Sequence, residues 1–315
     1  MISESLRVEV WDRLLRRKSL AELPLCTREG RVCLDGIQLP EPAVIGRWQT
    51  PLADVSQIEP SGTFREVRWS DLDFSGSKLP SLRFYASEVN NCRFDNCQLR
   101  DLRLWGTTIR DCSFRGTDLR GSALGAATNE GPLKGIRNVY LGVDFTEADL
   151  RDTAYLAAAF ERCTFRNTKL VQINFRNSTF VECRFEGELR EVLFWRTGFE
   201  GEAFPPNEMV NVDFSRAKLR DVEFRGLSLD QVQLPSDAEH IVIQDFAAVL
   251  DQLILALRQQ GDQTAKILVA GFEVARKWAA PHAPGVLNTQ DLAEAGPDAV
   301  ERVLVLVRQS NARPN

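Results

Sequence analysis

The chain has 315 residues, 43% of them hydrophobic, and a formal net charge of −5 at pH 7. This charge does not favour direct binding of nucleic acid, because proteins that bind it are usually basic. No apolar run approaches the ~20 residues of a membrane-spanning helix, and the N-terminal segment lacks the apolar core of an export signal. We therefore expect a cytoplasmic protein that does not associate with membranes and keeps its cysteines reduced.

The first segment, residues 1–61, is expected to cap one end of the molecule. Its pattern predicts a helix over about Glu4 to Leu20. The apolar residues that follow indicate an early, irregular part of the repeat described next; they are Val32, Leu34, Ile37 and Leu39. Residues 41–61 show no pattern to which we assign a structure.

The second segment, residues 62–235, repeats every five residues. Large apolar residues occupy every fifth position from Phe64 to Leu124, and the same spacing resumes from Phe145 to Phe185 and from Phe194 to Leu234. An α-helix repeats its apolar positions at three and four residues and a strand at two, so neither explains this period. A second column, two positions before each large residue, is mostly small or β-branched.

Several five-residue units resemble the pentapeptide-repeat family, whose motif is approximately A-(D/N)-L-x-x. They are TDLRG at residues 117–121, ADLRD at 148–152 and AKLRD at 217–221. The resemblance implies a mainly β fold, a right-handed quadrilateral parallel β-helix with one unit per side and four per coil. With four sides, residues 20 apart stack on adjacent coils, roughly 4.8 Å from one another. Phe74, Phe94 and Phe114 then form one column, and Phe145, Phe165 and Phe185 form another.

A break in the period and a proline-rich segment each predict a bulge. Leu124 and Phe145 are 21 residues apart, one more than a coil, which predicts a loop near residues 125–143. A second bulge is expected at the PPNEM segment after Phe204, because proline cannot donate to a strand ladder. Either the loops only absorb drift in register, or they contact a partner, as projecting loops do in the quinolone-resistance branch of the family. The second alternative makes Asn129, Lys134 and Arg137 candidate contact residues.

The third segment, residues 236–315, has a helical period. One helix carries Phe246, Val249 and Leu250 on its apolar side and stops at Gly261; others cover about Ala265 to Ala279 and begin near Pro297. We expect an α-helical region that caps the coil or joins two copies of the chain. Relatives dimerise through a C-terminal helix, so the resemblance implies a homodimer. Its expected contact residues are Leu253, Ile254 and Leu257.

The sequence offers little material for catalysis. Its two histidines, His240 and His282, lie outside the repeats, and no glycine-rich phosphate loop, HExxH motif or nucleophile elbow is present. We expect a protein that is not an enzyme and holds no cofactor and no metal. Cysteines 20 residues apart should point inward as small core residues, although a disulfide or metal site is also compatible with their stacking. These pairs are Cys92 with Cys112 and Cys163 with Cys183.

One outer face of the coil combines aromatic and basic residues. The 20-residue repeat places on it Arg65, Arg83, Tyr85, Arg103 and Trp105. Exposed aromatic rings framed by guanidinium groups are typical of binding hot spots. The same arrangement is compatible with an internal cation–π ladder that only stabilises the coil. Trp195 is a second candidate for an exposed aromatic contact.

Two functions fit these observations. The family includes proteins that mimic duplex DNA and protect type II topoisomerases such as DNA gyrase from poisons, which implies a non-enzymatic scaffold conferring antibiotic self-resistance. This chain departs from an acidic DNA mimic, because residues 62–235 contain 25 acidic and 24 basic side chains. The alternative is an immunity or effector-type interaction module with an unrelated protein partner. Fold alone does not choose between the two.

Overall fold

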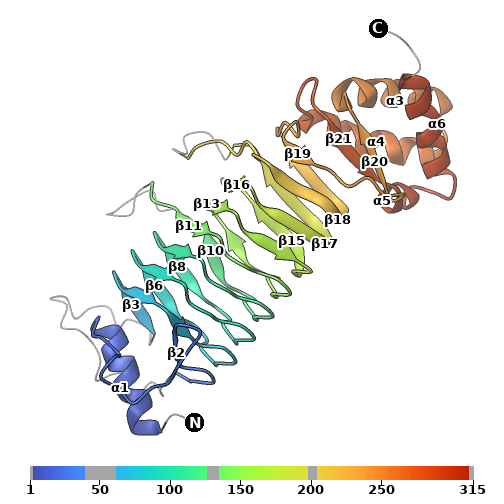
Figure 1. The fold of residues 1–315 in the computed structure, drawn as a ribbon. Helices are drawn as coiled ribbons and strands as arrows, with labels where there is room; N and C mark the ends of the chain where they lie inside the picture. The colour runs from blue at the N-terminus through green and yellow to red at the C-terminus, as the bar shows by residue number, and fades with distance from the viewer. Residues whose placement is uncertain (1–2, 40–61, 126–134, 198–203, 312–315) are drawn as a thin grey trace, which may run out of the picture. The chain divides into compact units, whose positions relative to one another are not determined.

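The computed structural model describes residues 3–39, 62–125, 135–197 and 204–311, in two compact units, Met1–Ile173 and Asn174–Asn315 (Figure 1). As predicted, the fold is mainly β, with parallel strands wound into a β-helix and helices in the C-terminal part. The division of the sequence at residues 61 and 235 stays a prediction. The expected loop residues 126–134 and the segment 41–61 lie outside the described residues.

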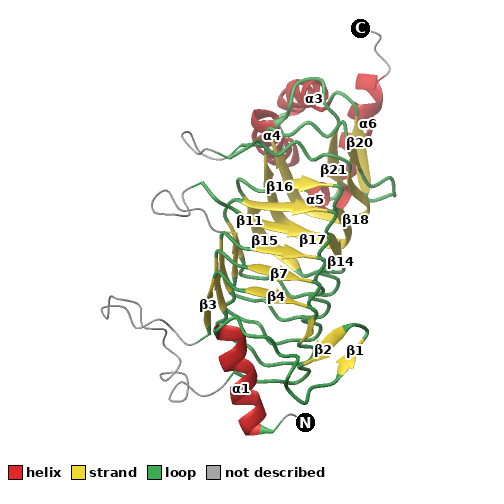
Figure 2. Ribbon diagram, turned by 60° about the vertical axis from the view of Figure 1, so that its left-hand side comes forward, coloured by secondary structure: helices red, strands yellow, loops and turns green. Residues whose placement is uncertain are grey.

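Helix α1 (Glu4–Leu15) covers the start of the first unit (Figure 2). The Ser3 hydroxyl caps it by accepting a hydrogen bond from the Leu6 amide at 3.3 Å. Trp11 is completely buried, and its indole nitrogen donates to the Gln38 carbonyl at 2.9 Å. Its ring lies 6.1–6.2 Å from the first three aromatic rings of the repeat, Phe64, Trp69 and Phe74. The predicted helix is real but stops at Leu15 rather than Leu20, because the chain turns at Arg17, whose φ is 60°.

The strands of the first unit form two parallel sheets and a small one. The first parallel sheet contains β3 (Thr63–Arg65), β6 (Arg83–Tyr85), β8 (Arg103–Trp105), β10 (Ala123–Gly125) and β12 (Ala154–Tyr155). The second contains β4 (Arg68–Ser70), β7 (Glu88–Asn90), β9 (Thr108–Arg110), β11 (Asn138–Leu141) and β13 (Ala158–Glu161). The small sheet contains β1 (Thr27–Arg28), β2 (Arg31–Cys33) and β5 (Leu72–Asp73), and β14 (Thr164–Arg166) follows β13 in the chain.

The register confirms four sides of five residues. Phe64 pairs with Phe84, and Phe84 with Leu104, so partners are 20 residues apart. Isolated bridges such as Asp73 to Arg93 and Lys78 to Gln98 mark the other two sides with the same separation.

The corners explain the five-residue period. In the described coils of the first unit, the residue two positions after each large apolar residue of the repeat has a positive φ, as at Asp71 (58°), Asn91 (47°) and Asp101 (59°). Glycine, asparagine and aspartate tolerate this left-handed conformation best, and Gly76 and Gly116 occupy two further corners. Each corner turns the chain, so the next large residue again points inward.

The core of the first unit is a stack of rings. The centroid separations of consecutive rings are 5.2, 4.9, 5.6 and 5.1 Å along the column Phe74, Phe94, Phe114, Phe145 and Phe165. The expectation that Phe145 and Phe165 begin a separate column is therefore wrong. Val139 pairs with Thr108, which lies 31 rather than 20 residues earlier, so the break inserts eleven residues and not one. The period resumes one unit earlier than expected, because Tyr140, five residues before Phe145, is buried and stacks on Phe160 at 4.8 Å.

The cysteines are free, and all but Cys26 are buried. The Cys92 amide donates to the Cys112 sulfur at 3.3 Å, as the inward, stacked placement predicts. Burial raises the pKa of Cys97 to about 12. In the described part of the chain, no three His, Cys, Asp or Glu side chains gather as a metal site would require.

The second unit begins with two long strands and two short ones. They are β16 (Thr179–Val181), β17 (Arg184–Trp195), β18 (Val212–Arg225) and β19 (Val232–Gln233), while β15 (Leu170–Phe175) leads into this unit. β17 and β18 run parallel, and Phe185 stacks on Phe214 at 4.6 Å and Phe194 on Phe224 at 5.4 Å. Pro205, in the predicted second bulge, precedes β18 and lies outside any strand.

The C-terminal part of this unit combines helices with a two-stranded sheet. The helices are α3 (Phe246–Gln260), α4 (Gln263–Trp278), α5 (Thr289–Ala293) and α6 (Ala299–Asn311). Gly261 ends α3 with a φ of 71°, as expected from the sequence. The prediction of helices alone is incomplete, because β20 (His240–Ile243) and β21 (Gly285–Asn288) pair antiparallel. Among the described residues, no helix is both long and apolar enough to cross a membrane.

The expected dimer contact residues lie in the core. Leu253 and Leu257 are 0% exposed and Ile254 is 8% exposed, and all three pack in one cluster with residues of α4 and α6. The expectation that they form an exposed dimer face is therefore wrong, because α4 and α6 already cover them. A homodimer through other parts of the C-terminal helices stays a prediction.

Candidate functional site

Three neighbouring parallel strands of one sheet, β3, β6 and β8, form the predicted aromatic and basic face. Parallel pairing places Arg65 beside Tyr85 and Tyr85 beside Trp105, and it places Arg83 beside Arg103. The five residues therefore share one side of the coil, and we call them the aromatic–arginine face. Tyr85 and Trp105 are both partly exposed. The register follows from the 20-residue repeat and was predictable from sequence.

The rings of this face form a short ladder. The Tyr85 and Trp105 centroids are 6.0 Å apart with planes inclined by 41°. The Arg65 guanidinium carbon lies 4.6 Å from the Tyr85 centroid, within the range of a cation–π contact. Such contacts restrict the orientations that the two rings and the Arg65 side chain can adopt.

A shared carboxylate orients the other two arginines. Arg103 donates from Nε to Asp101 at 2.8 Å, and Arg83 reaches the same carboxylate at 3.4 Å and the Ser81 carbonyl at 2.6 Å. Partial burial opposes ionisation of Asp101, but hydrogen bonds from Ser81 and Arg103 and the two positive charges lower its pKa below the ordinary value. The sequence pattern did not reveal Asp101 as the residue that holds this pair.

Two other predicted contact residues, Trp195 and Arg137, are described and have surroundings of their own. Trp195 belongs to the second unit, where its ring meets that of Trp278 at 5.4 Å in a T-shaped contact. The Arg225 guanidinium carbon lies 4.5 Å from the Trp195 centroid and 5.3 Å from the Trp278 centroid. Trp195 is thus a packing residue and not the freely exposed aromatic that we expected. Arg137 is partly buried, and burial lowers its pKa.

Asn129 and Lys134, the other two candidates on the predicted loop, lie outside the described residues. Their expected role in partner binding therefore stays a prediction from the register break alone.

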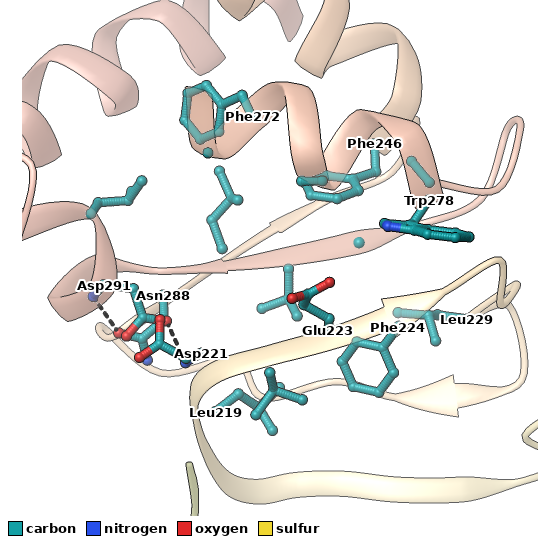
Figure 3. Close-up of a pocket in the computed structure, with 18 of the residues that line it drawn as sticks. Leu219, Asp221, Glu223, Phe224, Leu229, Phe246, Phe272, Trp278, Asn288 and Asp291 are labelled. Carbon is teal, nitrogen blue, oxygen red and sulfur yellow. Dashed lines mark hydrogen bonds between the residues drawn. The ribbon is translucent and has the colours of Figure 1, made fainter. Parts of the chain in front are cut away.

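A second candidate site is a cavity of about 530 Å³ within the second unit (Figure 3). Strand β18 supplies one wall with Leu219, Glu223 and Phe224, and Figure 3 shows Phe246 and Trp278 across the space from them. Asp221, Asn288 and Asp291 gather at one end. The lining comes from segments spread between residues 219 and 295, so no local sequence motif predicts the cavity. The nearest sequence signal is a pair of small residues, Gly271 and Ala275, on one side of α4.

Comparisons with known proteins identify the repeats. A family profile described as "Pentapeptide repeats (8 copies)" matches residues 87–125, and one described as "Pentapeptide repeat region" matches residues 157–234. No curated protein sequence matches the chain.

Several solved structures resemble the chain. Full-length QnrB1, a plasmid-mediated fluoroquinolone resistance protein, is 17% identical with a TM-score of 0.20, covering 55% of this chain and 82% of QnrB1. HetL, a protein involved in heterocyst differentiation regulation from the cyanobacterium Nostoc sp. strain PCC 7120, is 17% identical with a TM-score of 0.18, covering 55% and 85%. With its matching family profiles, five-residue period and four-sided parallel coil, the chain belongs to the pentapeptide-repeat family.

Proposed function

We propose that this protein is a non-enzymatic scaffold that binds a protein target and protects or inhibits it, and that the aromatic–arginine face makes the contact. The observation that carries the proposal is the Tyr85–Trp105 ladder, with centroids 6.0 Å apart on a solvated side of the coil. Aromatic and arginine side chains dominate the energetics of protein interfaces, particularly where they cluster.

The fixed orientation of the face favours binding. Association costs conformational entropy when flexible side chains become ordered, and pre-ordered side chains reduce that cost. Asp101 holds Arg83 and Arg103, while Arg65 stacks on Tyr85. Guanidinium groups bind carboxylates and stack on rings, so the complementary partner surface carries acidic and apolar side chains.

In its most concrete form the proposal is protection of a type II topoisomerase, DNA gyrase, from a poison. The charge distribution argues against protection by overall mimicry of DNA. Asp118 binds Arg100 at 2.6 Å and Arg120 at 2.9 Å, and Asp149 binds Arg151 at 2.7 Å. Acidic side chains paired in this way do not build the continuous negative stripe that electrostatic steering requires. Contact would then depend on the aromatic–arginine face.

The alternative is an immunity or effector-type module with an unrelated protein partner. The near equality of acidic and basic side chains in residues 62–235 and the partly exposed aromatic rings favour it. Localisation in the cytoplasm and a homodimeric state are parts of both proposals.

The test is the double variant Tyr85→Ala, Trp105→Ala. The matched control is Arg68→Ala, Glu88→Ala, which removes an exposed cross-coil ion pair of 3.4 Å from the neighbouring side. We expect the aromatic variant to weaken partner binding at least thirtyfold, about 2 kcal/mol, with little change in Tm. The control should bind normally. A fall of ~1 kcal/mol or more in stability with unchanged binding would show that the ladder is only structural.

A supercoiling assay with gyrase and a poison separates the two candidate partners. If the wild-type protein restores supercoiling and the aromatic variant does not, gyrase is the target. If the wild-type protein gives no protection, the gyrase proposal fails, and affinity capture from a native lysate with both variants then tests the alternative. A protein retained by the wild type and by the ion-pair control, but lost with the aromatic variant, identifies the partner.

A further inference from the structure

The cavity in the second unit has the size and lining of a small-molecule site. Ligand cavities are usually about 300–1,000 Å³ with mainly apolar walls and few polar groups. This cavity measures about 530 Å³. Aromatic rings form much of its lining; they are Phe224, Phe246, Phe272 and Trp278 (Figure 3).

Gly271 contributes to the lining and is itself exposed, so it lies where the cavity meets the surface. Gly271 lies in the interior of α4, and a Cβ atom built there meets nothing within 4 Å. Glycine weakens a helix interior relative to alanine, so Gly271 lowers helix stability without relieving any crowding. Gly285, by contrast, lies so close to Phe246 that a Cβ would come within 2.3 Å of the ring. The cavity is thus bounded by close packing on one side and open at Gly271.

The ionisable groups of the lining are all acidic. The lining contains four carboxylates and no lysine, arginine or histidine; the four are Asp221, Glu223, Asp291 and Glu294. Arg225 pairs with Glu223 at 2.7 Å, and Arg220 pairs with Asp291 at 2.8 Å and with Glu294 at 3.4 Å. Arg220 and Arg225, which are not part of the lining, therefore form ion pairs with three of the four carboxylates.

Asp221 is the fourth carboxylate, and its surroundings favour a cation. Its backbone amide donates to Asp291 at 2.9 Å, which brings the two acidic residues together at one end of the cavity. Asp221 is exposed, but partial removal from water and the negative charges of Asp291, Glu294 and Glu191 raise its pKa, while Arg220 opposes the rise only in part. A positive charge at this end would relieve the repulsion.

We propose that the cavity binds a small cationic amphiphile, with its apolar or aromatic body between β18 and α4 and its protonated amine at Asp221. The walls supply the hydrophobic contacts, and aromatic faces also attract an ammonium group. Anionic ligands are disfavoured because four carboxylates surround them without a basic residue in the lining. This site is independent of the aromatic–arginine face.

The experiment compares three probes of nearly equal shape: 1-naphthylmethylamine, 1-naphthylmethanol and 1-naphthoic acid. Binding to the full chain is followed by naphthalene fluorescence and by calorimetry. We expect the amine to bind about tenfold or more tightly than the alcohol, and the acid to bind most weakly. Amine affinity should fall as the pH is lowered and Asp221 gains its proton, whereas alcohol affinity should not change.

Two variants locate the site. Asp221→Asn keeps the shape and suits the positive φ of 50° at this position, so it should fold normally and lose about tenfold in amine affinity without changing alcohol affinity. Gly271→Leu should place a bulky side chain at the mouth of the cavity and weaken binding of both probes at least tenfold. The control Glu301→Gln removes an exposed charge from α6 and should bind as the wild type does.

Three outcomes would overturn the proposal. They are absence of amine binding up to about 1 mM, equal affinity for the amine and the acid, or full amine binding by a folded Gly271→Leu variant. Circular dichroism of each variant establishes that it is folded.

Discussion

The rings of Phe114 and Phe145 stack with centroids 5.6 Å apart and planes inclined by 14°, although 31 positions separate them in the chain. An uninterrupted coil would separate stacked residues by 20 positions. The intervening sequence is eleven residues longer than one coil, and the aromatic column continues from Phe114 to Phe145. The repeat therefore tolerates an insertion as long as the re-entry point restores the register.

We predict that Phe94→Ala costs ~3–5 kcal/mol of unfolding free energy, because it leaves a cavity between two stacked rings. Phe94 is 3% exposed and lies 5.2 Å from Phe74 and 4.9 Å from Phe114. The matched control is the exposed Gln98→Ala in the same coil, which should change stability by no more than about 0.5 kcal/mol. Urea denaturation measures both. Equal losses would contradict the inward placement of Phe94.

Asn91, a more obvious surface control, is unsuitable. Its side chain donates to Asp71 at 2.6 Å and accepts from Arg31, and its backbone turns a corner with a φ of 47°. We expect Asn91→Ala to be destabilising for those reasons.

Asn138 closes the coil where the chain returns from the insertion, and we predict that Asn138→Ala is severely destabilising. Its side chain is fully buried, accepts from the Thr107 amide at 3.0 Å, and donates to the Leu104 and Leu124 carbonyls at 2.9 and 3.1 Å. Each buried backbone group left without a partner costs ~1–3 kcal/mol. Thermal unfolding of Asn138→Ala and of Thr108→Ala, a neighbouring control, tests this. If the two variants had a similar Tm, the hydrogen bonds of the Asn138 side chain would not be needed, because water could satisfy the same backbone groups.

We predict that Trp11→Ala exposes the end of the aromatic column and promotes aggregation. Trp11 is 0% exposed and covers three rings, so its removal should cost ~3–5 kcal/mol and uncover strand edges. Light scattering during heating, compared with the wild type and with the exposed Glu4→Ala, measures the effect. Unchanged scattering and stability would mean that α1 does not act as a cap.

The thiols should differ sharply in reactivity. Burial raises the pKa of Cys97 to about 12, so its thiolate is rare at pH 8, whereas Cys26 is exposed. We expect iodoacetamide to modify Cys26 first and Cys97 only after unfolding, as followed by mass spectrometry. Rapid native-state modification of Cys97 would contradict its place in the core.

The same pKa shift predicts a pH dependence. The folded state holds the Cys97 proton more tightly than the unfolded state, so its contribution to stability is complete below the unfolded pKa of about 8.5. That contribution is lost as the pH rises from there toward about 12. Cys97→Ser should flatten this part of the stability profile, measured by urea denaturation at several alkaline pH values.

The sequence alone determined the repeating part of the fold. Large residues at every fifth position, with corner residues such as Asp71 and Asn91 between them, specify a chain that turns after each short side. Since partners in the coil are always one coil apart, the sequence also placed Tyr85 beside Trp105 on one face. Local patterns sufficed because each repeat contacts mainly its neighbours.

Other features were determined only by the tertiary structure, because the five-residue period carries no information about them. The pairing of Tyr140 with Ile109, 31 residues earlier, is a contact across the insertion. Asp101 was likewise not identified as the residue that holds two arginines. Strands β20 and β21 pair across more than forty intervening residues, so neither shows as a hairpin in the sequence. Leu253 and its neighbours are covered by α4, the next helix in the chain, and by the more distant α6, and the cavity is lined by several separate segments. These features arise from contacts between distant residues, which local periodicity does not encode.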